Sequence, residues 1–144
     1  MNDKTVSGIH WSFWVIGAVA LVWNGMGAIN YFMQMDPETL ASYPETHRAI
    51  VEGRPPWATA GFAIAVFGGA LASLLLLLRK SAAYYLFIAS LLGVILTMIH
   101  TVGVASSRND FGLFEVSMTI VMPLLVATFL VWYSKNTESR GWIN

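Results

Sequence analysis

The polar side chains best able to do chemistry in this chain lie inside, or at the edge of, long apolar stretches. They are two amides, one imidazole and one carboxylate: Asn24, Asn30, His100 and Glu115. A polar group in hydrocarbon is costly unless it is paired, so such groups often mark a solute path or a proton relay. At a rise of about 1.5 Å per residue, Asn30, His100 and Glu115 fall at similar depth on three different helices. We therefore expect them to form one polar cluster near a membrane boundary.

Two interpretations of this cluster stay open. In the first, the groups tie three helix ends together, with His100 either pairing with Glu115 or acting as a neutral hydrogen-bond partner. In the second, they line a site for a small or proton-linked solute beneath the segment 36–54. Asn24 lies deeper in its helix, close to two glycines, which is typical of a close-packed polar contact. One histidine and one carboxylate are too few ligands for a metal, so no metal site is expected.

A stripe of small residues recurs every four positions in the second apolar stretch. It consists of Gly61, Ala65, Gly69 and Ser73. In lipid, small side chains let two helix backbones approach closely. The stripe therefore predicts helix packing within the chain, or a homodimer contact with a second copy.

The elements that must position these residues are four uncharged stretches, each long enough to cross a bilayer, which takes about 20 apolar residues as a helix. We predict helices over about 11–32, 56–78, 82–104 and 114–133. Hydrophobic residues make up 56% of the 144-residue chain and charged residues only 11%, the reverse of the balance in a soluble domain. The expected fold is an all-α membrane protein, with one four-helix transmembrane domain over residues 1–144.

Several classes of function are disfavoured by features that the sequence lacks. It has no cysteine, which excludes disulfides, thiol catalysis and cysteine-ligated metals. A formal net charge of zero gives no indication of nucleic-acid binding. The sequence contains no Gly-rich phosphate loop, no HExxH motif, no serine elbow and no pair of carboxylates at membrane depth. We therefore expect no enzymatic activity, no catalytic residue and no cofactor.

The charged residues between the apolar stretches predict the orientation in the membrane. One side of the bundle is net positive, with Lys4, Arg79, Lys80, Lys135 and Arg140 against Asp3 and Glu138. The positive-inside rule places this side, and with it both termini, in the cytoplasm. The segment 36–54 then faces outward, where its apolar spacing predicts a short amphipathic helix that Pro44 breaks or restarts.

Two local signals concern the second half of the chain. A very short link at Arg79-Lys80 predicts that the second and third helices form an antiparallel hairpin. Pro123 lies inside the fourth helix, where it removes one backbone hydrogen bond and frees the carbonyl of Thr119. We expect a kink at this position.

The chain resembles a group of small four-helix bacterial membrane proteins over nearly its whole length. The features that carry the resemblance are Trp23-Asn24 with Gly27 and Tyr31, Pro44-Glu45 with Arg48, Trp57 to Ala60, Ala65 to Gly69, Leu74 to Lys80, Ser90 to Val94, His100, Met122-Pro123 and Arg140 to Trp142. Members of this group often carry the label "sugar transporter". The resemblance implies a location in the bacterial inner membrane and a four-helix fold, and it transfers no catalytic or binding residue.

These features lead to two functional hypotheses. The first is a non-enzymatic accessory, scaffolding or partner-binding protein of the lipid bilayer, with the small-residue stripe and the outer segment making its contacts in a homodimer or a larger membrane complex. The alternative is a small-solute, sugar-like transporter. A transporter would work as a dimer, because one four-helix unit offers little room for alternating access.

Overall fold

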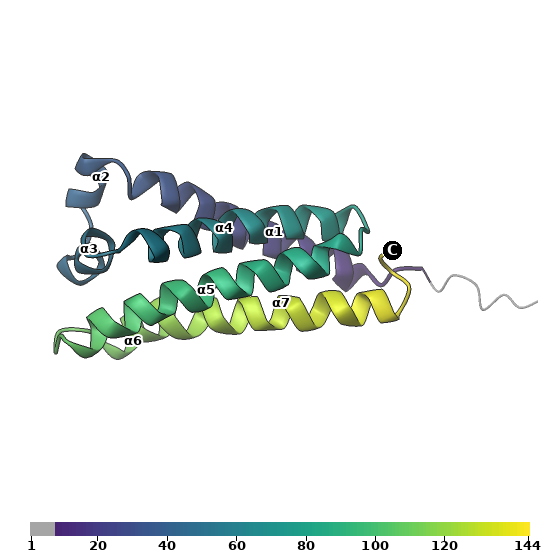
Figure 1. Ribbon diagram of the computed structural model, residues 1–144. Helices are drawn as coiled ribbons and strands as arrows, with labels where there is room; N and C mark the ends of the chain where they lie inside the picture. The colour runs from purple at the N-terminus through teal and green to yellow at the C-terminus, as the bar shows by residue number, and fades with distance from the viewer. Residues whose placement is uncertain (1–7) are drawn as a thin grey trace, which may run out of the picture.

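The computed structural model describes residues 8–144, and in this part of the chain all regular structure is helical (Figure 1). The four longest helical segments are α1 (Trp11–Met33), α4 (Pro56–Leu77), α5 (Ala82–Ser106) and the continuous segment Leu113–Ser139. Each is long and apolar enough to cross a membrane. The structure thus confirms the prediction of a helical, multi-pass membrane protein with four segments of spanning length.

Two short helices, α2 (Pro37–Ala41) and α3 (Glu45–Glu52), lie between α1 and α4. The side chain of Asp36 caps α2 by accepting a hydrogen bond from the backbone N–H of Thr39 at 2.9 Å. A hydrogen bond from the Thr39 hydroxyl and, after it, this backbone contact lower the pKa of Asp36. Pro44 then separates the two helices, and α3 packs against α5. Figure 1 shows both short helices at the end of the bundle opposite the C-terminus.

The closest helix pair is α4 with α5, which are joined by the short link at Arg79-Lys80. A Cβ atom at Gly93 would lie 2.5 Å from the carbonyl oxygen of Gly61 and 2.7 Å from the backbone nitrogen of Ala65. Only glycine can occupy position 93 at this separation of the backbones. The hydroxyl of Ser90 also donates across the pair, to the carbonyl oxygen of Ala65 at 2.6 Å.

At the other end of the small-residue stripe, Gly69 and Ser73 pack against α1. The Nδ2 atom of Asn24 donates to the carbonyl oxygen of Ala20 at 2.9 Å and to the hydroxyl of Ser73 at 3.4 Å. Its Oδ1 atom occupies the space where Gly69 lacks a side chain. The two halves of the stripe are therefore both in use within the chain: Gly61 and Ala65 face α5, while Gly69 and Ser73 face α1.

The helices pack in the order α1, α4, α5 and then the fourth segment, and α1 is not packed against α7 (Met122–Ser139) along its length. The two helices meet only near the end that carries the C-terminus, in a core that includes Phe13, Leu76, Phe87, Tyr133 and Ile143. Toward the other end they diverge, as the paths of α1 and α6 in Figure 1 show. The bundle is consequently closed at one end and open between α1 and α7 at the other.

The C-terminal residues close the tight turn between α4 and α5. The backbone N–H of Asn144 donates to the carbonyl oxygen of Arg79 at 3.0 Å, and the N–H of Ser81 donates to the carbonyl oxygen of Asn144 at 2.9 Å. Arg79 has a positive φ of 61°, as a turn this short requires. These contacts seal the end of the bundle where the four helices converge.

The fourth helix differs from its predicted form in two ways. It comprises α6 (Leu113–Val116), a π-helical turn η1 (Ser117–Val121) and α7, so Pro123 follows a widened turn. A π turn shifts the backbone pairing by one residue and accommodates the N–H that proline lacks. The helix also continues to Ser139, beyond the predicted end near 133. An ion pair of 2.9 Å between Lys135 and Glu138, one turn apart, accompanies this extra length.

Candidate functional site

A cavity of about 410 Å³ lies between the helices of the bundle. It is bounded by α1, α4, α5 and the η1–α7 segment, and α3 covers one end of it. Along α1 the lining runs from Trp23 to Gln34, a distance of about 16 Å at 1.5 Å per residue. Its volume falls in the range of roughly 300–1,000 Å³ that is usual for small-molecule sites. A side-chain packing defect would be far smaller.

The covered end of the cavity is polar, and its central residue is Arg54, in the link between α3 and α4. The Nη1 atom of Arg54 donates to Oε1 of Gln34 at 2.9 Å, and the guanidinium lies 4.7 Å from the centre of the Phe62 ring. Its Nε atom is fully buried and has no hydrogen-bond partner among the described residues. Burial lowers the pKa of Arg54, although an arginine stays charged at neutral pH.

His47 of α3 lines the same end of the cavity and packs edge-on against Tyr43, with ring centres 5.0 Å apart. Burial lowers the pKa of His47, and the nearby charge of Arg54 lowers it further, while Glu115 acts in the opposite direction. His47 is therefore neutral at pH 7. None of the described lining residues is an aspartate or a glutamate, which leaves Arg54 as the one formal charge in this lining.

The three polar residues predicted to cluster near this boundary lie at the α3 end, and each binds a different residue of the segment 43–50. Asn30 accepts a hydrogen bond from the Tyr43 hydroxyl at 2.9 Å. Glu115 accepts one from the hydroxyl of Thr46, the second residue of α3. His100 bonds through Nε2 to the carbonyl oxygen of Ile50 at 2.9 Å. Their hydrogen bonds thus connect three long helices through the covering segment, and His100 and Glu115 have separate partners.

Asn24, the fourth predicted polar residue, borders the cavity but is engaged in helix packing. Both of its hydrogen bonds as a donor go to α1 and α4, as described above. The hydroxyls deeper in the cavity are also engaged: Ser90 bonds α4, Thr97 bonds the carbonyl oxygen of Gly93, and Thr101 bonds that of Thr97. The inner part of the cavity is therefore largely apolar in its chemistry, despite the polar residue types that line it.

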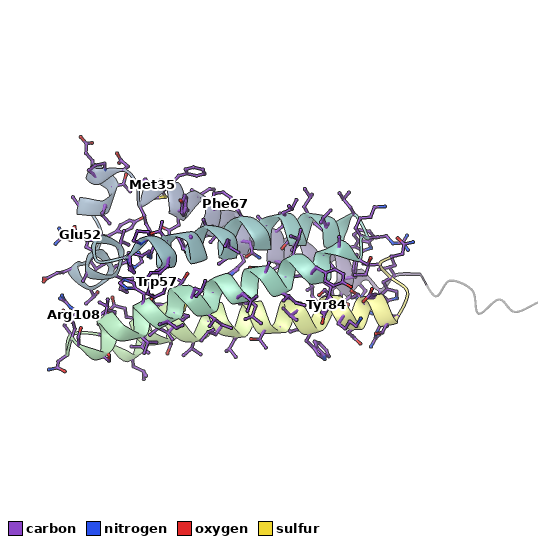
Figure 2. All side chains as sticks on the ribbon, viewed as in Figure 1. Met35, Glu52, Trp57, Phe67, Tyr84 and Arg108 are labelled. Carbon is purple, nitrogen blue, oxygen red and sulfur yellow. The ribbon has the colours of Figure 1, made fainter. Side chains whose placement is uncertain are left out.

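A charged cluster lies outside the cavity at the same end of the bundle. Arg108 pairs with Asp110 at 2.6 Å and with Glu45 of α3 at 3.3 Å, and these contacts raise its pKa and lower that of Asp110. Figure 2 shows Arg108 and Glu52 at this end, with Tyr84 at the opposite end. Because Glu45 and Asp110 are well exposed, such pairs contribute little to stability.

Sequence reasoning missed Arg54 and Gln34 as site residues. No motif marks Arg54 as a site residue, although its place directly before Pro55-Pro56 fixes it at the start of a helix and close to the membrane boundary. Gln34 ends α1 and is only 8% exposed. Within residues 8–144 there is no group of three or more His, Cys, Asp or Glu side chains placed to hold a metal.

Comparisons with family models, with curated proteins and with solved structures find no match for this chain. What the protein can bind must consequently be inferred from the cavity and from the residues that line it.

Proposed function

We propose that this protein binds a small solute within the membrane, in the cavity between α1, α4, α5 and α7. The cavity itself carries the proposal: about 410 Å³ of space, closed at one end by packed side chains and covered at the other by α3. A protein whose only task is to hold partners has no need of such a space, because lipid-facing surfaces suffice for helix association.

The proposed setting is the bacterial inner membrane, with both termini in the cytoplasm. The distribution of charge supports this orientation, because Arg79, Lys80, Lys135 and Arg140 gather at the closed end of the bundle. In this orientation α3 and the cavity end that it covers face the outside. The solute would then enter from the outer leaflet or from the outer aqueous phase. The proposed role is binding or carriage of the solute, without covalent chemistry.

An accessory or scaffolding role, which the sequence favoured, is the second candidate. The small-residue stripe of α4 cannot make its contacts, because α1 and α5 already cover it. What supports this candidate is the fourth segment, of which only 11% of the most apolar window is buried, against 39% for α4. A second copy or a partner helix could close the flank between α1 and α7, which would also suit a dimeric transporter.

Two matched variants test the proposed function. Val126 lines the cavity and is half-buried, while its neighbour Leu125 is 59% exposed on the outer surface of α7. Val126→Trp places a large ring in the cavity, and Leu125→Trp places the same ring in lipid. Each form is extracted from membranes directly into nanodiscs, and small molecules released from it are identified by mass spectrometry.

Solute binding predicts a compound that accompanies the wild-type protein and Leu125→Trp but is depleted in Val126→Trp. Equal amounts in all three samples would overturn the proposal, as would the absence of any compound above empty nanodiscs. A stable homodimer or a stoichiometric protein partner in that second case would move the assignment to the accessory role. Melting temperatures of the three proteins establish that each variant is folded.

A further inference from the structure

We propose that the ligand of this cavity is an amphiphilic anion, with its carboxylate or phosphate head group on Arg54 and its single apolar chain in the inner cavity. This inference depends on the proposed function, since it names the class of solute that the cavity binds. It follows from three observations: a cation without a counter-charge in the lining, an inner cavity where most hydroxyls donate to the backbone, and an open flank toward lipid.

The first observation is the state of Arg54. A guanidinium carries five N–H donors, and hydrogen bonding within the described chain uses only the contact to Gln34. Its Nε–H is buried without an acceptor, and the described lining supplies no carboxylate. A partly buried cation without a counter-charge is costly, whereas an anion at this position would supply both the missing acceptor and the missing charge. Arginine is also suited to a carboxylate or phosphate, because its planar fork binds both oxygens at once.

No other formally charged side chain of the described residues lines this end of the cavity. His47 is neutral at pH 7, and its pKa is lowered further by Arg54 itself. Glu115, the nearest carboxylate of the covering contacts, accepts a hydrogen bond from Thr46 and does not line the cavity. Arg54 is therefore the one formal charge in the described lining, and in surroundings of low dielectric constant it attracts an anion, although the charge of Glu115, which reaches His47, acts in the opposite direction.

The second observation is the chemistry of the inner cavity. A sugar needs many hydrogen-bonding groups, but Ser90, Thr97 and Thr101 each donate to a backbone carbonyl. Asn24 uses its amide hydrogens in packing against α4 and in its own helix. Apart from the hydroxyl of Thr119, what this part of the cavity offers a ligand is mainly apolar surface, from partly buried lining residues such as Phe62, Met98 and Val126. Such a lining favours a hydrocarbon chain over a polyol.

The third observation is the route of entry. The lining includes Trp23 and Met26 from α1 and Met118 from η1, and Met26 and Met118 are 64% and 45% exposed. Because α1 and α7 diverge here, these side chains border a flank that faces lipid. An amphiphile in the outer leaflet can enter along this flank with its chain in hydrocarbon throughout, and its head group then lies at the depth of Arg54. A sugar would have to leave water to take the same path.

The test is equilibrium binding of radiolabelled dodecanoate and dodecanol to the full chain in nanodiscs, with empty nanodiscs measuring partition into lipid. Arg54→Gln removes the charge, and Arg48→Gln removes an equal charge from α3 outside the cavity lining. We expect saturable binding of dodecanoate that Arg54→Gln weakens roughly 10- to 100-fold, as expected for a hydrogen bond to a charged group. Arg48→Gln should bind like the wild type, and Arg54→Lys should recover part of the affinity.

The outcomes separate the two proposals. If dodecanol binds as tightly as dodecanoate and Arg54→Gln changes neither, while Val126→Trp removes both, the cavity binds amphiphiles but the anion assignment is overturned. If neither amphiphile binds while a compound is still depleted by Val126→Trp, the ligand is of another class and only this inference fails. If Val126→Trp has no effect on any bound compound, the proposed function fails with it.

Discussion

The Nε2 atom of His100 lies 2.9 Å from the carbonyl oxygen of Ile50, so a side chain of α5 closes the C-terminal end of α3. The last carbonyls of a helix have no partner within it. Here the carbonyl oxygens of Ala49 and Val51 accept from the backbone N–H groups of Gly53 and Arg54. The carbonyl oxygen between them, that of Ile50, accepts from His100. Because a carbonyl can only accept, Nε2 carries the proton in this contact. At the other end of α3, Glu115 accepts from Thr46, so both ends of the covering helix are fixed to long helices.

Removal of the histidine contact should loosen α3 without unfolding the bundle. For His100→Ala we expect a loss of about 0.5–1.5 kcal/mol in the local stability of α3, the usual contribution of one hydrogen bond. Faster amide exchange confined to residues 45–54 would show this in hydrogen-exchange mass spectrometry. Ser106→Ala, which removes an exposed hydroxyl further along α5, is the control and should leave α3 unchanged. Equal exchange in the wild type and both variants would mean that His100 does not hold α3.

The contact of α4 with α5 should tolerate no methyl group at its centre. Gly93→Ala places a Cβ atom against the backbone of Gly61 and Ala65, and the helices must separate to admit it. We expect a destabilisation of about 1–3 kcal/mol, as for other overpacked sites. Gly103→Ala is the matched control on the same helix, because nothing lies within 4 Å of its added methyl group and alanine is the better helix former. Thermal unfolding in one detergent compares the two, and equal melting temperatures would contradict the close approach.

Features of this molecule that depend on neighbouring residues could be predicted from the sequence, whereas contacts between distant segments could not. The four spans follow from local composition, and the hairpin at Arg79-Lys80 from the brevity of its link. Placing His100, Glu115 and Asn30 at one depth needed only the helical rise. Their partners in the segment 43–50 could not be predicted, because they depend on how this segment folds back over the bundle. The cavity could not be predicted either, because it forms where α1 and α7 are not in contact. Pro123 indicated a disturbance of the fourth helix, but the form that it takes, a π turn, depends on the backbone pairing of the whole segment.

Asn24 is expected to matter for stability more than for ligand binding. Asn24→Ala removes the bond to Ser73 and leaves the space above Gly69 empty, so we expect a loss of about 1–2 kcal/mol in the free energy of unfolding. Dodecanoate affinity should change far less than in Arg54→Gln, because the amide offers the ligand no free N–H. A variant with normal melting temperature and abolished binding would instead assign Asn24 to the ligand site.

The stability of the bundle should fall in mild acid through His47. Its pKa in the folded protein lies below the ordinary value of 6.5, first because of burial and then because of Arg54, with Glu115 opposing them. The unfolded chain therefore takes up a proton at a higher pH than the folded chain, and stability declines as the pH falls below about 6.5 and through the folded pKa. His47→Gln should remove this component and flatten the fall in melting temperature between about pH 7 and about pH 5. His10→Gln, at an exposed histidine near the opposite end, should retain the wild-type slope.

Since protonation of His47 also adds a second positive charge beside Arg54, dodecanoate should bind more tightly at the lower pH in the wild type than in His47→Gln. If the melting temperature of His47→Gln fell more steeply with decreasing pH than that of the wild type, the lowered pKa of His47 would be contradicted. The imidazole at the cavity would then be charged and stabilising.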